Sequence, residues 1–508
     1  MSYGSMSEDE FDDSSDFEMY GSEDDDNDID GDQTEDMEFL EHKQKKAYEV
    51  EFKSLLLSDI LLAQSSASNH VAGILGVTVS QAVRLLRNHK WNKERLIEKY
   101  MDTPQEILDQ AGVVLDEEQP ALQDRPEGFV CLICFDDDSL GSALGLRCGH
   151  IFCQPCYEQY LTQKIVEEGE CRAILCPESG CSVAVDEQVI NSVVEHSVMQ
   201  KYRMLQDRAY VSDLDNLCWC PAPNCENAVE CRLSHNSFST TVPTVLCACG
   251  NKFCFGCGLG DHQPAPCGLV KLWQKKCADD SETANWISAN TKECGKCQST
   301  IEKNGGCNHM TCRKCSYEFC WVCMGPWSEH GTVWYNCNRF EETNGSNARN
   351  QQEKSRASLE RYLHYYNRFA NHEQSAKLDH NLYLKTEKKM EEMQRTSELS
   401  WIEVQFLKKA VDVLTSCRMT LRWTYAFAFY LVKDNMTELF EDNQRDLEVA
   451  VEALSELLEK PVEREKIAEL RQQVLDKTVY VGVRREVVLD DTAKGLADGR
   501  WVFHSQIN

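Results

Sequence analysis

The hydrophobic and polar positions of residues 46 to 112 predict a small helical module. Apolar residues recur there at helical spacing, at Ala82, Leu85, Leu86, Leu96, Ile97 and Tyr100. Two helix starts are marked: Thr78 with Gln81 has the form of a capping box, and Asn92 can cap the helix that follows it. We expect three helices, which form either a packing platform or a binding module.

From about Arg349 onward, three apolar stripes predict an α-helical bundle that spans residues 345 to 508. Such stripes usually form the core of a bundle. The stripes are Leu359, Tyr362, Leu363 and Tyr366; then Trp401, Val404, Leu407, Val411 and Leu414; then Leu447, Val451, Leu454 and Leu458.

Between these regions, residues 131 to 337 have few long apolar runs and are dense in Gly, Pro and Asn. They hold 26 of the 27 cysteines, and Cys417 is the exception. Bound metal must therefore replace a hydrophobic core. A polar, helix-compatible linker over residues 268 to 292 divides this region into parts that could move relative to each other.

The chain of 508 residues is too long for one core, so several domains are expected. It opens without an apolar leader, and its richest apolar stretch, Tyr425 to Val432, is too short to span a membrane. We therefore expect a reducing compartment, the cytoplasm or nucleus, where thiols stay free to bind metal.

The net charge of -31 argues against a protein whose main partner is nucleic acid. Acidic residues are concentrated at the start: residues 1 to 41 hold 18 Asp and Glu and no Lys or Arg. A segment of this composition repels itself and cannot bury a core, so residues 1 to 45 are expected to be a disordered acidic tail. The tail is either a solvating segment or one that binds a partner.

The cysteines and histidines fall into three clusters of eight, which predicts six structural zinc ions with four ligands each. The Cys-x-His step of the first cluster is typical of a RING, in which ligand pairs interleave. The first cluster is Cys131, Cys134, Cys148, His150, Cys153, Cys156, Cys176 and Cys181; the second is Cys220, Cys225, Cys247, Cys249, Cys254, Cys257, His262 and Cys267; the third is Cys294, Cys297, Cys312, Cys315, Cys320, Cys323, His330 and Cys337.

Six thiols remain after this assignment: Cys171, Cys218, Cys231, Cys277, Cys307 and Cys417. Cys307 differs from the others because it lies inside the third cluster, in a loop that metal tethers at both ends. Gly305 and Gly306 precede it and leave room for a bulky partner.

His309 follows Cys307 by two residues, so in an extended segment the imidazole projects to the side of the sulfur. An imidazole there can stabilise a thiolate or take a proton from an attacking amine. Glu318 is a candidate to orient His309. The alternative is that Cys307 is a zinc ligand or an inert spare thiol and His309 a local hydrogen-bonding group. Sites closed by four protein ligands disfavour zinc-activated water.

The three clusters, with a lone Gly-Gly-Cys-x-His in the third, resemble the RING-between-RING ubiquitin ligases. The motifs WCPAPNC, TKECGKC, GGCNHM, FCWVCMGPW and SWIEVQFLKKAVDVL resemble the Ariadne branch of that family, and the resemblance covers residues 46 to 508. It implies a multidomain fold: a UBA-like module at 46–112, a first RING at 127–185, an in-between-RING at 200–268, a helical linker at 269–292, a catalytic second RING at 293–340 and a helical Ariadne domain at 345–508.

The resemblance also implies a function. The first RING docks a ubiquitin-conjugating enzyme through loop residues such as Ile133, ubiquitin passes to Cys307, and His309 acts as general base when ubiquitin moves to a substrate lysine. The Ariadne domain is expected to mask Cys307 until a neddylated cullin-RING ligase, which the amino-terminal module helps to recognise, engages the protein. The inhibitory contacts map to Leu378, Asp379 and Glu452, and the first two depart from the Phe-Glu of related sequences.

Two alternatives remain open. One is a non-catalytic RING adaptor that only brings a charged conjugating enzyme to its target, in which Cys307 is incidental. The other is a zinc-finger protein that binds nucleic acid, which the acidity of the chain and its lack of a basic, aromatic face oppose.

Overall fold

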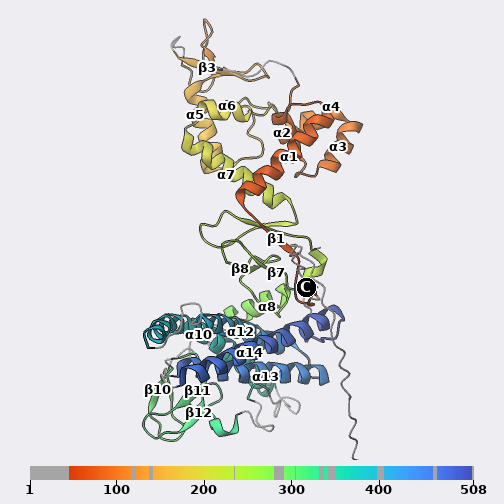
Figure 1. Cartoon of the computed structure of the whole chain (residues 1–508). Helices are drawn as coiled ribbons and strands as arrows, with labels where there is room; N and C mark the ends of the chain where they lie inside the picture. Colours follow the sequence, from red (N-terminus) through yellow and green to blue (C-terminus); the bar gives the residue numbers. More distant parts are fainter. Residues whose placement is uncertain are drawn as a thin grey trace, which may run out of the picture. The chain divides into compact units, whose positions relative to one another are not determined.

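The structure is a computed structural model of the whole chain (Figure 1). It describes residues 45–115, 122–136, 141–233, 235–279, 291–303, 305–330, 337–340, 351–396, 405–460 and 466–505. The acidic tail predicted at residues 1 to 45 therefore lies almost entirely outside the described residues. Among the helices that are described, none has the length and apolar character needed to cross a membrane.

The amino-terminal module contains one helix more than predicted: α1 (Leu57–Leu75), α2 (Val79–Asn88), α3 (Lys93–Asp102) and α4 (Pro104–Ala111). Both predicted caps are confirmed, because Thr78 Oγ1 accepts from the Gln81 N–H and Asn92 Oδ1 accepts from the Arg95 N–H. The extra helix begins at Pro104, whose fixed φ favours the first helical position. Its buried side chains join the predicted apolar face against Tyr210 and Val211.

A strand before this module, β1 (Phe52–Leu55), belongs to the second cysteine cluster and was not predicted. It pairs antiparallel with β6 (Ala228–Cys231), which also pairs with β5 (Leu217–Trp219), so the sheet order is β1-β6-β5. The segment from Tyr48 to Leu55 therefore packs on the second cluster, and Lys46 and Ala47 bond to Glu486 and Asp490 of the carboxy-terminal region, although the sequence analysis placed all of them in the helical module.

The cysteine-rich middle is built from short elements, as its composition predicts. The first cluster contains a three-stranded sheet and helices; the second contains the sheet described above and a short hairpin, and the third contains two short hairpins. The elements are β2 (Leu122–Asp124), β3 (Ser142–Gly145), β4 (Ile151–Cys153), α5 (Gln154–Thr162), η1 (Gln163–Glu167), α6 (Glu187–Val193), α7 (His196–Asp213), η2 (His235–Ser239), β7 (Thr244–Leu246), β8 (Lys252–Cys254), β9 (Thr291–Glu293), β10 (Thr300–Glu302), β11 (His309–Thr311), β12 (Glu318–Cys320) and η3 (Trp327–Glu329).

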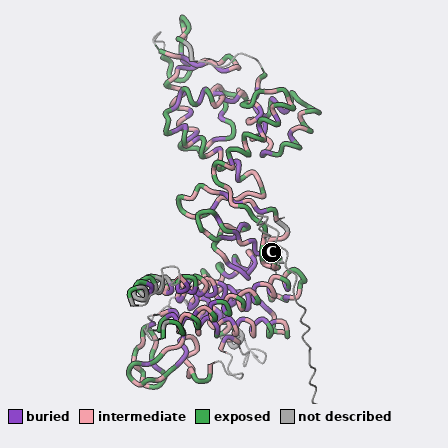
Figure 2. Tube along the Cα trace, viewed as in Figure 1, coloured by how far each residue is buried: buried purple, intermediate pink, exposed green. Residues whose placement is uncertain are grey.

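The carboxy-terminal region is the predicted helical bundle, and its long helices lie side by side in Figure 1. They are α10 (Gln351–Thr396), α12 (Phe406–Tyr430), α13 (Asn435–Glu459) and α14 (Ile467–Ala497). The apolar residues of α12 and α13 from the predicted stripes are buried, and Figure 2 shows the buried stretches along these helices. Trp401 and Val404 of the second stripe lie outside the described residues.

The stripe predicted on α10 is partly wrong. Leu359 is 43% exposed, whereas Tyr362, Tyr365 and Phe369 are buried. The inward face of α10 therefore lies part of a turn away from the predicted one, because it packs against aromatic rings, one of which comes from another segment. That segment is α8 (Cys267–Asp279), the helical part of the predicted linker. Its Trp273 is fully buried against rings of α10 and α12, so this part of the linker is fixed to the bundle.

Candidate active site

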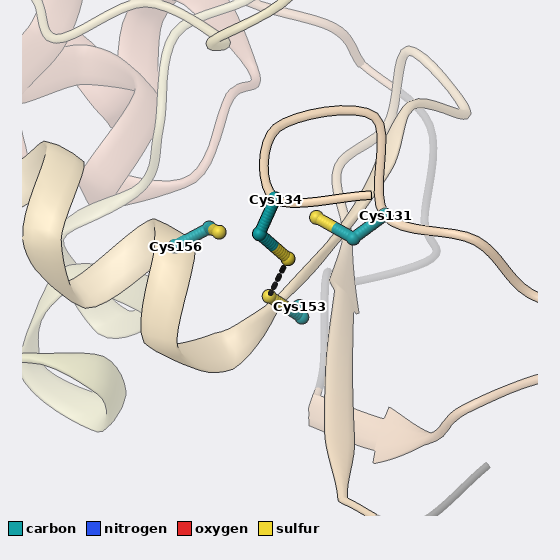
Figure 3. A group of neighbouring side chains, drawn as sticks. All are labelled: Cys131, Cys134, Cys153 and Cys156. Atoms are coloured by element: carbon teal, nitrogen blue, oxygen red, sulfur yellow. Dashed lines mark hydrogen bonds between the residues drawn. The ribbon is translucent and has the colours of Figure 1, made fainter. Parts of the chain in front are cut away.

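The structure gathers the predicted metal ligands into groups of four. In the first cluster, the first and third pairs of ligands along the chain form one group, and the second and fourth pairs form the other, which is the interleaved pairing of a RING. In the other two clusters, pairs that follow one another along the chain form the groups. The groups are Cys131, Cys134, Cys153 and Cys156 (Figure 3); Cys148, His150, Cys176 and Cys181; Cys220, Cys225, Cys247 and Cys249; Cys254, Cys257, His262 and Cys267; and Cys294, Cys297, Cys312 and Cys315.

The remaining predicted ligands are also neighbours. Cys323 Sγ lies 3.1 Å from His330 Nε2, and the thiols of Cys320 and Cys323 both contact that of Cys337. These four residues come from β12, the turn after it and the segment that leads toward α10.

Sulfur spacing within the groups fits a tetrahedral metal ion. The Cys134–Cys153 Sγ distance is 3.7 Å, as is that of Cys294–Cys315. Four thiolates about 2.3 Å from a central ion stand about 3.8 Å apart, whereas a disulfide would bring two sulfurs to about 2.05 Å. The donor set of thiolates with single imidazoles is also the one that closed structural zinc sites use.

Cys307 belongs to none of these groups. It follows β10 and precedes β11, in a segment that we call the Cys307 loop and define as Lys303 together with residues 305 to 308. The side chain is only 6% exposed, because α10, α12 and α13 of the bundle cover the loop. A methyl group at Gly305 or Gly306 would overlap the carboxylates of Glu459 and Asp379, so the two glycines permit this close contact.

A buried network of charges joins the bundle to the residue after the cysteine. Glu452 of α13 accepts hydrogen bonds from Asn308, at 2.6 Å from the backbone N–H and 2.9 Å from Nδ2. Arg418 of α12 donates to Glu452 at 3.1 Å and to Asp379 of α10 at 2.8 Å. Arg418 and Asp379 are completely buried. Two of the three predicted inhibitory residues thus contact the Cys307 loop or its partners directly.

Leu378, the third of these predicted residues, is half-buried beside Asp379 on α10. Its side chain is apolar and cannot join the ion pairs of that network, so any part it plays in the mask is apolar packing.

This environment keeps the thiol protonated. Burial raises the pKa of Cys307 well above its usual range, and the Glu452 carboxylate raises it further. The His309 backbone N–H, 3.4 Å from the sulfur, opposes the shift, as does Arg418. Because the thiolate is the nucleophilic form of cysteine, the raised pKa lowers the reactivity of this thiol, and burial limits access to it.

His309 and Glu318 come together on the β11–β12 hairpin. His309 Nε2 lies 3.3 Å from Glu318 Oε2, and the ring stacks on Trp327 with centroids 4.3 Å apart. The described contact of His309 with the sulfur is made by its backbone, and its ring is held by Glu318 and Trp327. Glu318 is thus placed to fix the orientation of the imidazole, as the sequence analysis suggested.

Ile133 lies on the surface of the first cluster, far along the chain from Cys307. It is 44% exposed, and Leu132 and Phe135 beside it are 62% and 76% exposed. Three exposed apolar side chains on a loop fixed by metal ligands form a patch suited to a protein partner.

Sequence reasoning missed several residues around Cys307. Arg418 was detectable, since it places a charge within a run of buried positions on α12, and a fully buried charge needs a partner. Nothing in the sequence marked the polar residues on α10 and α13 that complete the network, namely Asn371, Ser375, Ser455 and Glu459.

Four family models match parts of the chain. They are the UBA-like domain of "E3 ubiquitin-protein ligase ARIH1" at residues 63–102, the IBR domain described as a half RING-finger domain at 200–267, a second IBR domain at 289–338 and the Ariadne domain at 360–483. These ranges include most of α1, all of α2 and α3, the second and third clusters, and most of the bundle.

Relatives of known activity match over almost the whole chain. E3 ubiquitin-protein ligase dbl4 of Schizosaccharomyces pombe is 56% identical over 91% of both chains. The chain belongs to the Ariadne family of RING-between-RING E3 ubiquitin-protein ligases. E3 ubiquitin-protein ligase ariadne-1 of Drosophila melanogaster is 44% identical over 94% of this chain and 95% of its own, and ARIH1 of Homo sapiens is 46% identical over 82% and 76%.

Membership of the Ariadne family confirms the resemblance read from the motifs. The protein is a ubiquitin transferase whose partners include ubiquitin and a ubiquitin-conjugating enzyme. Thioester transfer and autoinhibition are general features of Ariadne-family ligases.

Proposed function

We propose that Cys307 is the residue that carries ubiquitin, and that the structure described above is the closed, inactive form. The observation that carries the proposal is that Cys307 is the cysteine within the third cluster that no group of metal ligands uses. A thiol that is free of metal, flanked by glycines and covered by another domain has the properties of a regulated nucleophile.

The proposed reaction has two exchanges at one carbonyl carbon. The Cys307 thiolate attacks the ubiquitin thioester on the conjugating enzyme; a new C–S bond forms, the old one breaks, and the cysteine of the conjugating enzyme leaves as thiolate. A substrate lysine amine then attacks the Cys307 thioester, an amide bond forms, and the Cys307 thiolate is released. The proton lost by the amine passes to His309, whose ring Glu318 orients.

The direct test is a single-turnover reaction with a conjugating enzyme that already carries ubiquitin. We expect an adduct of one ubiquitin on the full-length protein that a thiol reductant removes, and peptide mass spectrometry should place it on Cys307. Ubiquitin chains that form with no such adduct would instead support the RING adaptor.

We propose that the exposed loop of the first cluster receives the conjugating enzyme. Ile133→Ala removes part of an exposed apolar contact, so we expect transfer from the charged enzyme to fall about tenfold, as for an ordinary interface anchor. The rate is measured at subsaturating conjugating enzyme. Val166→Ala, at a position 40% exposed on η1, is the matched control and should keep the parent rate. Equal rates for both variants would place the docking surface elsewhere.

We propose zinc as the metal and six as the count, since thiolates with single imidazoles in closed groups of four suit zinc. Elemental analysis of the purified protein should find six zinc ions per chain. Cys297→Ala should lose one ion and loosen the third cluster, whereas Cys277→Ala, on α8 and outside every group, should keep all six. Six ions in both variants would rule out Cys297 as a ligand.

We also propose that a neddylated cullin-RING ligase opens the closed form and that protein substrates are modified in the cytoplasm or nucleus. Support comes from the resemblance of the chain to its family and from thiol ligands that need a reducing compartment. The test is whether the neddylated complex, and not its unmodified form, accelerates formation of the adduct on Cys307.

A further inference from the structure

Lys303 has a role that the proposed transfer reaction does not yet assign. It is 4% exposed, and a buried ammonium is costly unless its N–H groups have partners. Its Nζ atom donates to oxygens on two separate parts of the protein. Between Cys297 and Cys312, Lys303 is the single Lys or Arg in the sequence.

Two of the acceptors flank the cysteine. Lys303 Nζ lies 3.1 Å from the carbonyl oxygen of Gly306 and 3.0 Å from Oδ1 of Asn308. One ammonium thus ties together the residues immediately before and after Cys307. Both contacts lie within the Cys307 loop, so they do not depend on the helices that cover it.

The other two acceptors belong to α10. They are Ser375 Oγ at 2.9 Å and Asn371 Oδ1 at 3.4 Å. Asn371 Nδ2 also donates to Asn308 Oδ1 at 3.0 Å, so α10 completes the clamp from outside. When the bundle withdraws, water can replace these two acceptors while the two contacts inside the loop remain.

The charges around the sulfur also divide between the two parts. The bundle presents Asp379, Arg418, Glu452 and Glu459 to the loop, and the third cluster itself contributes the Lys303 ammonium and the backbone N–H of His309. Withdrawal of the bundle removes three carboxylates and Arg418 together. Lys303 then remains beside the thiol, where a cation favours the thiolate.

We propose that Lys303 is a positioning residue for Cys307: its ammonium holds the two residues that flank the cysteine and stabilises the thiolate once the bundle has withdrawn. In the closed form the same ammonium attaches the loop to α10. The inference rests on the proposed role of Cys307, because a thiolate is useful there only if that sulfur reacts.

The test measures alkylation of Cys307 by iodoacetamide against pH, with the modified peptide identified by mass spectrometry. The full-length chain carries Glu452→Ala so that the sulfur is exposed. We expect Lys303→Met to move the midpoint of the profile upward by about one pH unit, because loss of a nearby cation raises a thiol pKa. Lys303→Arg keeps the charge, so its midpoint should stay close to that of the parent.

Asn371→Ala is the matched control, since it removes a contact to α10 and leaves both contacts inside the loop; its midpoint should equal that of the parent. Zinc content and helical circular dichroism establish that each variant folds, and Lys303→Gln replaces Lys303→Met if the latter does not. An unchanged midpoint in a folded, uncharged variant would overturn the proposal, as would equal shifts for the Met and Arg variants. Alkylation needs no ubiquitin, so failure of this inference is distinguishable from failure of the transfer reaction.

Discussion

Replacing Cys307 with alanine is expected to abolish ubiquitin transfer, with a loss of about a thousandfold or more, because removal of a covalent nucleophile leaves no alternative path through the same site. Cys307→Ser should trap ubiquitin as an oxygen ester that resists thiol reductants but not alkali. The measurement is single-turnover discharge of a charged conjugating enzyme, followed by non-reducing electrophoresis. The variant should fold normally, since Cys307 binds no metal in the proposed assignment.

The matched control is Cys277→Ala, which removes a half-buried thiol that lies in none of the ligand groups named above. We expect it to form the adduct at the parent rate. The outcome that contradicts the proposal is undiminished substrate modification by Cys307→Ala, since the protein would then act as an adaptor and the free thiol would be incidental.

Glu452→Ala is expected to accelerate transfer about 30-fold. Glu452 accepts two hydrogen bonds from Asn308 and one from Arg418, so alanine leaves buried donors without an acceptor. The loss of the two hydrogen bonds to Asn308, about 2 kcal/mol, falls on the closed form alone, because the open form does not make these contacts with the Cys307 loop. Such a difference changes the ratio of open to closed molecules by about 30-fold.

The measurement is the rate of discharge onto Cys307 in the absence of any activating complex, together with the rate of Cys307 alkylation at fixed pH. Asp379→Asn should act in the same direction with a smaller effect, since it weakens the ion pair with Arg418 and leaves the hydrogen bonds between Glu452 and Asn308 intact. Glu456→Gln, an exposed position on the same helix, is the control and should behave as the parent. If Glu452→Ala and Glu456→Gln discharged at the same rate, α13 would not be the mask.

In the closed form, the same contacts that cover Cys307 also lower its reactivity, so no other device is needed to protect the thiol from oxidation. Burial and Glu452 raise the pKa of Cys307, so the covered sulfur resists both oxidation and premature reaction. In the proposed open form, the carboxylates are withdrawn and access to the sulfur is restored in a single movement. The accessibility and the nucleophilicity of Cys307 are therefore expected to rise together, so one structural change increases the rate of transfer in two ways.

Much of the chemistry could be predicted from the sequence because metal ligation is a local property. A zinc ion needs four Cys or His residues at short spacings, so counting and spacing led to the groups that the structure brings together, with Cys307 left over. Helix caps such as Thr78 with Gln81 depend on residues three positions apart and were predicted for the same reason.

The contacts that cover Cys307 were beyond sequence reasoning from composition and spacing. Asn308 and Glu452 are 144 residues apart in the chain, and their meeting depends on how α13 packs against the third cluster. The pairing of β1 with β6 and the burial of Tyr365 in place of Leu359 depend on tertiary contacts in the same way. The sequence by itself predicted which sulfur of the third cluster is left over, since that follows from the number of local ligands. Only the tertiary structure decided which residues cover that sulfur and that they raise its pKa, because burial and charge at one atom depend on every segment that packs around it.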